Sequence, residues 1–410
     1  MKKTYRVLAL LIVLLTILAL YGQYRVVRYP RITVDPTPRP DSLVLDSGLE
    51  VEASGGYLKE ALEARFRAYQ PDMRLYISSH GQTARQIVRF ENIHPDAVFA
   101  WAGDSRAEVL EIKHGLLREV EVSGMQAGEV LKLSWEFPEK LVYRFVAIGD
   151  TGGDQELSWG LIRAHELGAD FVLHLGDAYY DKSELGDIGA RMNESRIPIY
   201  TANGNHDFLG PNGNAIDKFL KNIGPLNARF SLLNNCFINL DTGAYMHPPH
   251  KGARAELLAA EVVNQRRYPE RCTNTIVFTH KPMVMEFEAE FPQREHALHG
   301  YDSKSMVSQL QQLDRVSLIA GHIHNDFEFE QDGFKTYVTG SGLAHKDLVQ
   351  GGHYARVLVG EIRADKPVKL EWELNAMPMG YHCSKKIYEL LVRHKSPLAK
   401  EVRDACAARL

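Results

Sequence analysis

Carboxylate, amide and imidazole side chains directly follow five apolar runs of this 410-residue sequence. The five junctions are Gly149-Asp150, Gly176-Asp177, Gly204-Asn205, Thr279-His280 and Gly321-His322. A glycine lets the chain turn sharply, so the polar side chain after it points away from the end of the run. Each junction alone is typical of a turn or a structural histidine. Because Asp, Asn and His suit iron, zinc or manganese, the five together predict a metal centre.

The apolar runs that must position these groups are of buried-strand type. They cover residues 143–148, 171–175, 198–202, 275–278 and 316–320, and helix-like stretches such as 155–166, 254–267 and 303–313 lie between them. Alternation of strands and helices predicts a layered α/β domain, which we place at 143–375. In such sheets the functional groups gather at the carboxyl ends of the strands. We therefore expect the five junctions to meet at one rim.

The rest of the chain divides by composition. Residues 46–142 contain short alternating segments such as 107–113 and 116–122, which predict a small antiparallel β-sandwich-like domain. The stretch 56–69 is also compatible with a helix. Residues 376–410 form a tail with two predicted helices, 387–394 and 398–410. We find no chemical motif in residues 46–142.

The N-terminus has the pattern of a membrane-targeting segment. Lys2, Lys3 and Arg6 precede an apolar run at 7–21 in which only Thr16 is polar. We interpret residues 1–23 as an uncleaved anchor, with a cleaved signal peptide as the alternative. A proline-rich tether, 24–45, follows it. The catalytic domain is then expected on the exported side of the membrane, periplasmic or extracytoplasmic, or secreted if the segment is cleaved.

Cysteine content and charge add two expectations. The four cysteines, Cys236, Cys272, Cys383 and Cys406, show no metal-binding spacing, and an even number behind an export signal fits disulfides. Cys236 and Cys272 each precede an apolar run, so neighbouring strands are able to pair them; four buried thiols are the alternative. The net charge of −4 and the lack of a basic stripe argue against nucleic-acid binding.

The ordered motifs GD, GDxxY, GNHD, H and GHxH resemble the calcineurin-like metallophosphoesterase superfamily over roughly residues 143–345. More narrowly, they resemble the purple acid phosphatases. Most of the superfamily has Asp-x-His in the first motif, whereas Asp150 is followed by Thr151 and Gly152. Purple acid phosphatases replace the lost histidine with a tyrosine three residues after the second aspartate, where Tyr180 stands. The resemblance implies a layered metallophosphoesterase-type α/β sandwich.

The resemblance also implies two metal ions. The first would be held by Asp150, Asp177, Tyr180 and His324, and the second by Asp177, Asn205, His280 and His322. A phenolate with carboxylates is a hard anionic set, which favours Fe(III) at the Tyr180 site. Imidazoles and an amide suit divalent zinc, iron or manganese at the other. Tyr179 is the neighbouring candidate for the tyrosine ligand, but the family spacing favours Tyr180.

The function implied is hydrolysis of phosphate monoesters by a metal-bound hydroxide, with the metal pair stabilising the attacking and departing oxygens. His206 would bind the phosphoryl group or protonate the leaving oxygen, and Asp207 would orient His206 or a ligand. His296 and His299 lie in a loop where the family often places substrate-facing histidines. The family commonly has an aromatic-rich segment directly after the position of His280, whereas this sequence has Lys281-Pro-Met-Val-Met285 there. Lys281 would attract phosphate or, as is more common for lysine, be exposed to solvent.

The substrate of a monoesterase would be a phosphorylated small molecule or a phosphoprotein. Two other functions fit the same residues. A phosphodiesterase acting on nucleotides or glycerophosphodiesters would use the same metal pair. A non-catalytic surface-binding protein would have lost ligands, and none of the expected ligands is missing from this sequence.

The tyrosine assignment predicts a colour. The purified protein should show a tyrosinate–Fe(III) charge-transfer band in its visible spectrum, and the band should vanish in Tyr180→Phe because the phenolate is lost. Visible spectra with metal quantification measure this. A colourless protein that carries only two zinc or manganese ions, and stays fully active after the substitution, would contradict the assignment.

Overall fold

The computed structural model describes Thr16 and residues 41–45, 49–60, 64–81, 85–103, 106–152, 155–179, 188–208, 214–243, 253–283, 300–324, 326–340, 354–376 and 385–406. The predicted membrane segment at 1–23, apart from Thr16, and the tether up to residue 40 lie outside this set. The predicted end of the tether at residue 45 is wrong, because Asp41–Val44 form a strand that pairs with residues 50–53. Among the described residues, no helix is long and apolar enough to cross a membrane. The anchor therefore stays a prediction.

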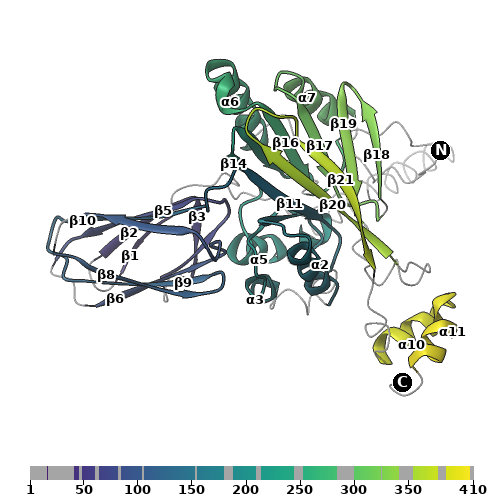
Figure 1. The fold of residues 1–410 in the computed structure, drawn as a ribbon, viewed down its shortest axis with the longest axis horizontal. Coiled ribbons are helices and arrows are strands. Elements are labelled where there is room, and N and C mark those ends of the chain that lie inside the picture. Colours follow the sequence, from purple (N-terminus) through teal and green to yellow (C-terminus); the bar gives the residue numbers. More distant parts are fainter. Residues whose placement is uncertain are drawn as a thin grey trace, which may run out of the picture.

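Residues 41–136 form two five-stranded sheets that face each other (Figure 1). One has the order β1 (Asp41–Val44), β2 (Leu49–Ser54), β5 (Met73–Ser79), β10 (Val130–Glu136), β7 (Val98–Ala102). The other has the order β3 (Gly56–Glu60), β4 (Arg65–Ala68), β6 (Gln86–Glu91), β9 (Leu117–Ser123), β8 (Glu108–His114). Alternate residues of both sheets fill one core around Phe66, Phe90 and Trp135. We call this unit the β-rich domain.

The possible helix at 56–69 is wrong. This stretch forms β3 and β4, which pair antiparallel with Gly56 opposite Ala68. Phe66 enters the core of the β-rich domain, and strand pairing with β6 holds the segment extended. Packing against neighbouring strands decides β structure more than local preference does.

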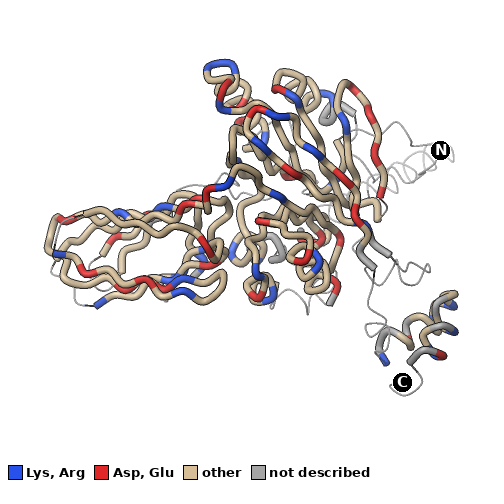
Figure 2. Tube along the Cα trace, viewed as in Figure 1, with Lys and Arg blue, Asp and Glu red and all other residues tan. Residues whose placement is uncertain are grey.

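Charged residues of both signs lie along the strands of the β-rich domain (Figure 2). Arg89 and Glu119, on the paired strands β6 and β9, form a salt bridge of 2.7 Å. Such exposed cross-strand pairs add little stability but keep the outer face polar, which matches the alternation seen in the sequence.

The following residues build two more sheets that pack face to face. The first has the order β13 (Ile199–Thr201), β12 (Phe171–His174), β11 (Val142–Ile148), β20 (Tyr354–Arg363), β21 (Lys369–Ala376). The second has the order β14 (Ala228–Leu232), β15 (Asn235–Leu240), β16 (Asn274–Thr279), β17 (Val316–Ala320), β19 (Phe334–Thr339), β18 (Asp326–Gln331). An aromatic core that includes Phe145, Phe171 and Phe237 fills the space between them.

Helices cover the outer faces of both sheets (Figure 1). α2 (Gln155–Glu166), α3 (Ile188–Asn193) and α5 (Asn214–Asn222) share a core with the first sheet. α6 (Ala253–Arg267) and α7 (Gly300–Leu310) share one with the second. The order of layers is helices, sheet, sheet, helices. The five strands and three helices predicted for this part are confirmed, whereas β14, β15 and β18–β21 were not predicted.

The tail contains α10 (Lys385–Arg393) and α11 (Leu398–Cys406), as predicted within a few residues. Leu391 and Val402 are buried where the two helices pack together. Figure 1 shows this pair set apart from the two large sheets. Cys383 lies outside the described residues.

Cys236 and Cys272 form a disulfide, with their Cα atoms 5.4 Å apart. Cys236 lies in β15, and Cys272 follows a short 3₁₀ helix, η2 (Pro269–Arg271), just before the neighbouring strand β16. The pairing allowed by the sequence is therefore confirmed, and the alternative of buried thiols at these two positions is wrong.

This disulfide should stabilise the fold. It joins residues 36 positions apart, and a loop of that length corresponds to about 4 kcal/mol of chain entropy. Urea unfolding with and without reductant should show a loss of that order for the wild type. The double variant Cys236→Ala/Cys272→Ala should be insensitive to reductant. Equal responses of the two proteins would show that the bond contributes nothing.

Candidate metal centre

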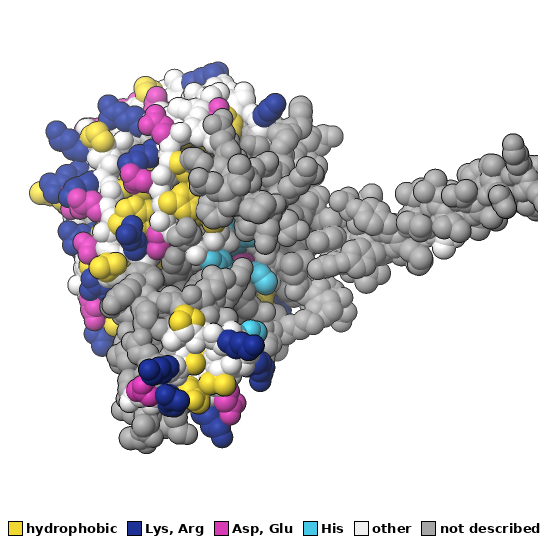
Figure 3. Space-filling view, turned by 90° about the vertical axis from the view of Figure 1, so that its right-hand side faces the viewer, with side chains coloured by type: hydrophobic (Ala, Val, Ile, Leu, Met, Phe, Trp, Pro, Cys, Tyr) yellow, Lys and Arg dark blue, Asp and Glu magenta, His cyan; other side chains and the backbone are white. Residues whose placement is uncertain are grey.

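The strand ends of both sheets are joined at one rim by backbone hydrogen bonds. Asp150 N donates to Gly176 O at 3.0 Å, and Gly152 N donates to Asp177 O at 3.1 Å. Gly321 N donates to His280 O at 2.8 Å in the other sheet. These bonds join the loops after β11 and β12 in one sheet and those after β16 and β17 in the other, and His322 N donates to Asp150 Oδ2 at 2.8 Å between the two sheets. Figure 3 shows histidine side chains gathered on this face of the molecule.

Two glycines are required for the loops to come this close. A Cβ atom on Gly204 would lie 2.1 Å from Asp177 N, and one on Gly321 would lie 2.6 Å from Asp150 Oδ2. Both distances are shorter than any tolerable contact. Glycine before Asn205 and before His322 therefore allows the loops to pack against the two aspartates.

Four polar residues of the rim have left-handed backbone conformations. The φ angles are 57° for Asp150, 51° for Asp177, 74° for His322 and 55° for His324. Such conformations cost free energy in residues with a Cβ atom, and they concentrate at functional sites. Here they turn the four side chains towards one another.

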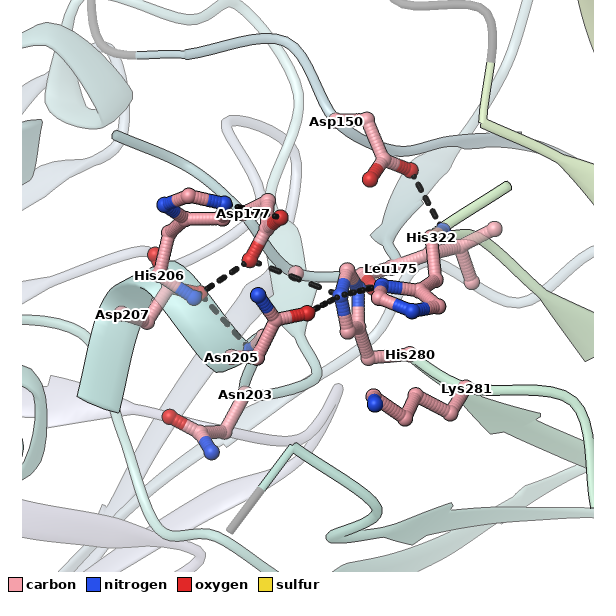
Figure 4. Close-up of polar contacts among 12 residues, drawn as sticks. Asp150, Leu175, Asp177, Asn203, Asn205, His206, Asp207, His280, Lys281 and His322 are labelled. Carbon is pink, nitrogen blue, oxygen red and sulfur yellow. Dashed lines mark hydrogen bonds and ion pairs between the residues drawn. The ribbon is translucent and has the colours of Figure 1, made fainter. Parts of the chain in front are cut away.

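The side chains form two groups that share one carboxylate (Figure 4). Asp150, Asp177 and His324 make up the first group, and Asp177, His280 and His322 the second. In each group, one ligand atom per residue lies within 4.8 Å of the others. Asn205 joins the second group, with its Oδ1 2.8 Å from His280 Nε2. Asp177 is the member common to both.

The donor set of the second group fits a cation. His280 Nδ1 lies 2.8 Å from the carbonyl oxygen of Leu175, so Nδ1 carries the proton and Nε2 presents a lone pair. That lone pair faces the amide oxygen of Asn205 and, at 3.5 Å, a carboxylate oxygen of Asp177. His322 Nδ1 lies 3.1 Å from the same Nε2 atom of His280. Electron pairs that converge in this way are stabilised by a shared metal ion.

Electrostatics point in the same direction. Asp177 is 1% exposed, and its burial, followed by repulsion from Asp150 and Asp207, raises its pKa well above the ordinary value. Burial also lowers the pKa of His280 well below its ordinary value, which keeps the imidazole neutral. Neutral histidine and ionised carboxylate are the forms that bind metals, and a bound cation would offset the repulsion between the carboxylates.

The predicted catalytic residues occupy different positions. The His206 side chain is 45% exposed, and its Nε2 lies 3.9 Å from Asp177 Oδ2. Asp207 is buried, and its carboxylate accepts hydrogen bonds from Ala178 N at 3.0 Å and Gly204 N at 2.8 Å. Burial raises the pKa of Asp207 to about 7. Asp207 thus connects the loops that carry Asp177 and Asn205.

Three predicted site residues, Tyr180, His296 and His299, lie outside the described residues. The competing Tyr179 is buried, and its hydroxyl donates to the backbone oxygen of Asp207. Burial raises the pKa of Tyr179, which disfavours a phenolate there. Tyr179 therefore packs under the loop.

The expectation of an exposed Lys281 is wrong. Its side chain is 1% exposed, and its backbone N–H donates to Thr242 Oγ1 at 2.7 Å. Figure 4 shows it beside His280, and its charge contributes to the low pKa of that histidine. The strand end at His280 carries the lysine inward with it. In the sequence, the burial of Lys281 was indicated only by its place directly after the candidate ligand His280.

A buried histidine below the rim was not predicted. His174 Nδ1 accepts a hydrogen bond from Gly176 N at 3.3 Å, so its Nε2–H donates to Thr151 Oγ1 at 2.9 Å. Thr151 in turn donates to Gly152 O at 3.0 Å. His174 thus links the loop after β11 to the end of β12. A lone histidine within an apolar strand was the signal for it.

Residues 143–326 match the family model described as calcineurin-like phosphoesterase, and this part of the chain is a domain of that family. Proteins of that family are hydrolases of phosphoester bonds that depend on two metals. Comparison with curated protein sequences finds no match.

Three solved structures are similar at low identity. Purple acid phosphatase PPD1 from yellow lupin (Lupinus luteus) seeds is 13% identical, with a TM-score of 0.46, over 74% of this chain and 70% of its own. A dimetal phosphatase from Danio rerio is 13% identical, with a TM-score of 0.42, over 58% of this chain and 100% of its own. PhoD is 11% identical, with a TM-score of 0.41, over 82% and 90%. The family assignment rests on the match of residues 143–326.

The buried His174 predicts a pH-dependent stability difference. Its pKa falls from 6.5 to about 3 on burial, so its contribution to stability is fully present above the unfolded pKa. That contribution is lost as the pH falls towards about 3, because the unfolded chain binds the proton first. His174→Asn should cost about 1–3 kcal/mol at neutral pH through the unpaired Thr151.

The deficit should shrink by about 1.4 kcal/mol for each pH unit below the unfolded pKa, since only the wild type loses this contribution. Urea unfolding of both metal-free proteins at neutral pH and about two units lower measures it. A deficit that does not change with pH would contradict the role of His174.

Proposed function

We propose that this protein is a binuclear-metal phosphoesterase of purple acid phosphatase type that hydrolyses phosphate monoesters. The observation that carries the proposal is the position of Asp177, which belongs to two groups of potential ligands at once. A carboxylate with two oxygens is able to bridge two ions. A pair of ions held in this way suits displacement at phosphorus, because both the attacking and the departing oxygens can be stabilised.

The two groups differ in character, which supports different metals. Asp150, Asp177 and His324, completed by Tyr180, would form the harder anionic site for Fe(III). Asn205, His280 and His322, with the shared carboxylate, would hold divalent zinc, iron or manganese. When bound, the ions supply Lewis acidity that activates water and offsets charge on the phosphoryl oxygens.

The chain's own residues would orient the substrate and move the proton. His206 is half exposed at the rim, and its backbone N–H donates to Asp177 Oδ1 at 2.9 Å, which fixes its position beside the shared carboxylate. From there its imidazole would donate a hydrogen bond to a phosphoryl oxygen or a proton to the leaving oxygen. Asp207 would keep the loops of Asp177 and Asn205 at a fixed separation through the two amides that it binds.

We also propose that the enzyme acts on the exported side of a membrane. Two observations support this location: the basic and apolar pattern of residues 1–23, and the disulfide between Cys236 and Cys272. Disulfides persist mainly in oxidising compartments. The substrate would then be a phosphorylated small molecule or phosphoprotein available there, and residues 1–23 would make the membrane a partner.

The function is tested by parallel assays on 4-nitrophenyl phosphate and bis(4-nitrophenyl) phosphate, with metal content measured on the same samples. We expect two metal ions per chain and faster turnover of the monoester. Faster turnover of the diester would establish the phosphodiesterase alternative, which uses the same metal pair. A protein with no activity on either ester would exclude both.

Matched histidine variants connect the activity to the metal centre. Replacing a residue that only hydrogen-bonds to a metal ligand typically lowers metal affinity or activity by about 10–100-fold. Loss of a ligand itself should cost more, so His280→Asn should lower activity by at least about 100-fold and remove one metal ion. His94 is also buried, but it lies in the β-rich domain outside both groups, and His94→Asn should keep both ions. Equal metal content in the two variants would exclude His280 as a ligand.

A further inference from the structure

The β-rich domain touches the catalytic sheets at the strand that leads to Asn205. We propose that this domain is a structural part of the metal centre, and that Asn92 is the positioning residue through which it acts. The inference rests on the proposed function and extends it to a part of the chain that has no chemistry of its own. The contact is made by the Asn92 side chain and the backbone of Ile199 in β13.

Asn92 binds β13 as another strand would. Its Nδ2 donates to Ile199 O at 2.9 Å, and its Oδ1 accepts from Ile199 N at 2.9 Å. The same Nδ2 donates to Ala68 O at 2.9 Å, which ties the contact to β4. Asn92 is 1% exposed, so water does not compete for these bonds. Buried amide bonds of this kind fix a backbone segment firmly.

The strand held in this way has little other support. β13 covers three residues and is the edge strand of its sheet, with only β12 beside it. On that side Ile199 is opposite Val172, so the Asn92 amide satisfies the edge that faces away from the sheet. An edge strand this short depends on such a partner to keep its position.

β13 runs directly into the ligand loop. Ala202 N donates to His174 O at 2.7 Å just after the strand ends, and α4 (Asn205–Phe208) begins three residues later. Asn205 Oδ1 then lies 2.8 Å from His280 Nε2. A shift of β13 along its edge would therefore move the amide oxygen away from the imidazole of the second group.

Buried charges fix Asn92 itself. The preceding residue, Glu91, accepts from Lys59 at 2.8 Å and from Arg67 at 3.4 Å. Arg67 is fully buried and donates to Asn193 Oδ1 in α3 at 2.5 Å. This network is a second contact between the β-rich domain and the catalytic sheets, made at α3 and not at β13. Asn92 has a φ of 64°, which aims its side chain at β13.

The test compares three variants of the detergent-solubilised full chain after removal of metals. Asn92→Gly keeps the left-handed backbone without strain and deletes only the amide. Asn193→Ala removes a domain contact away from β13. Asn234→Gly deletes an exposed asparagine with a φ of 59° in the β14–β15 turn. Calorimetric titration with Zn²⁺ and thermal unfolding are measured for each.

We expect Asn92→Gly to bind Zn²⁺ with about tenfold lower affinity than the wild type at one of the two sites, and with unchanged affinity at the other. Asn193→Ala should lower the unfolding midpoint and leave both affinities as in the wild type. Asn234→Gly should change neither. If Asn92→Gly does not fold, Asn92→Asp should show the same selective weakening, because its second carboxyl oxygen would face the carbonyl oxygens of Ile199 and Ala68 to which Nδ2 donates.

Wild-type affinity at both sites in a folded Asn92 variant would overturn the inference and leave the proposed function intact. Equal weakening in Asn193→Ala would also overturn it, because general loosening of the domains would then explain the effect. A wild-type chain that binds fewer than two Zn²⁺ ions would overturn the proposed function, and the inference with it.

Discussion

The carboxylate of Asp177 lies almost entirely out of contact with water, next to those of Asp150 and Asp207. The residues around these buried carboxylates must offset their lost hydration and their mutual repulsion. One backbone amide, from His206, donates to Asp177 Oδ1, but a single amide does not offset the loss of hydration. The imidazoles of His280 and His324 lie close enough for cations to be shared between them and the carboxylates. Stability of this rim and its capacity to bind metals therefore have the same origin.

The two sheets contribute complementary groups to the rim. The first sheet supplies the candidate oxygen ligands, with Asp150, Asp177 and Asn205 following the ends of β11, β12 and β13. The second supplies the imidazoles at the ends of β16 and β17. The distance between the two kinds of ligand is set by the aromatic core between the sheets, which close packing makes rigid. Core packing thus determines the geometry of a site that contains none of the core residues.

Much of this arrangement could be predicted from local patterns. Short apolar runs that stop at a glycine gave the five strands and the junction residues, and apolar periodicity gave helices such as α2 at 155–166. Predictions failed where a partner remote in the sequence decides the outcome. Residues 65–67 are extended because β6 pairs with them, and Lys281 is buried directly after the end of β16.

The sequence by itself determined which ligand types stand at the strand ends and that they would meet at one rim. Its glycine spacing and strand alternation are local properties, and local properties are readable without partners. Only the tertiary structure decided that Lys281 is buried and that Asn92 closes the edge of β13. Asn92 and Ile199 are 107 residues apart, and no local pattern encodes that contact. Contacts of that kind depend on how separately folded sheets and domains pack, since their free energy exists only in the assembled molecule.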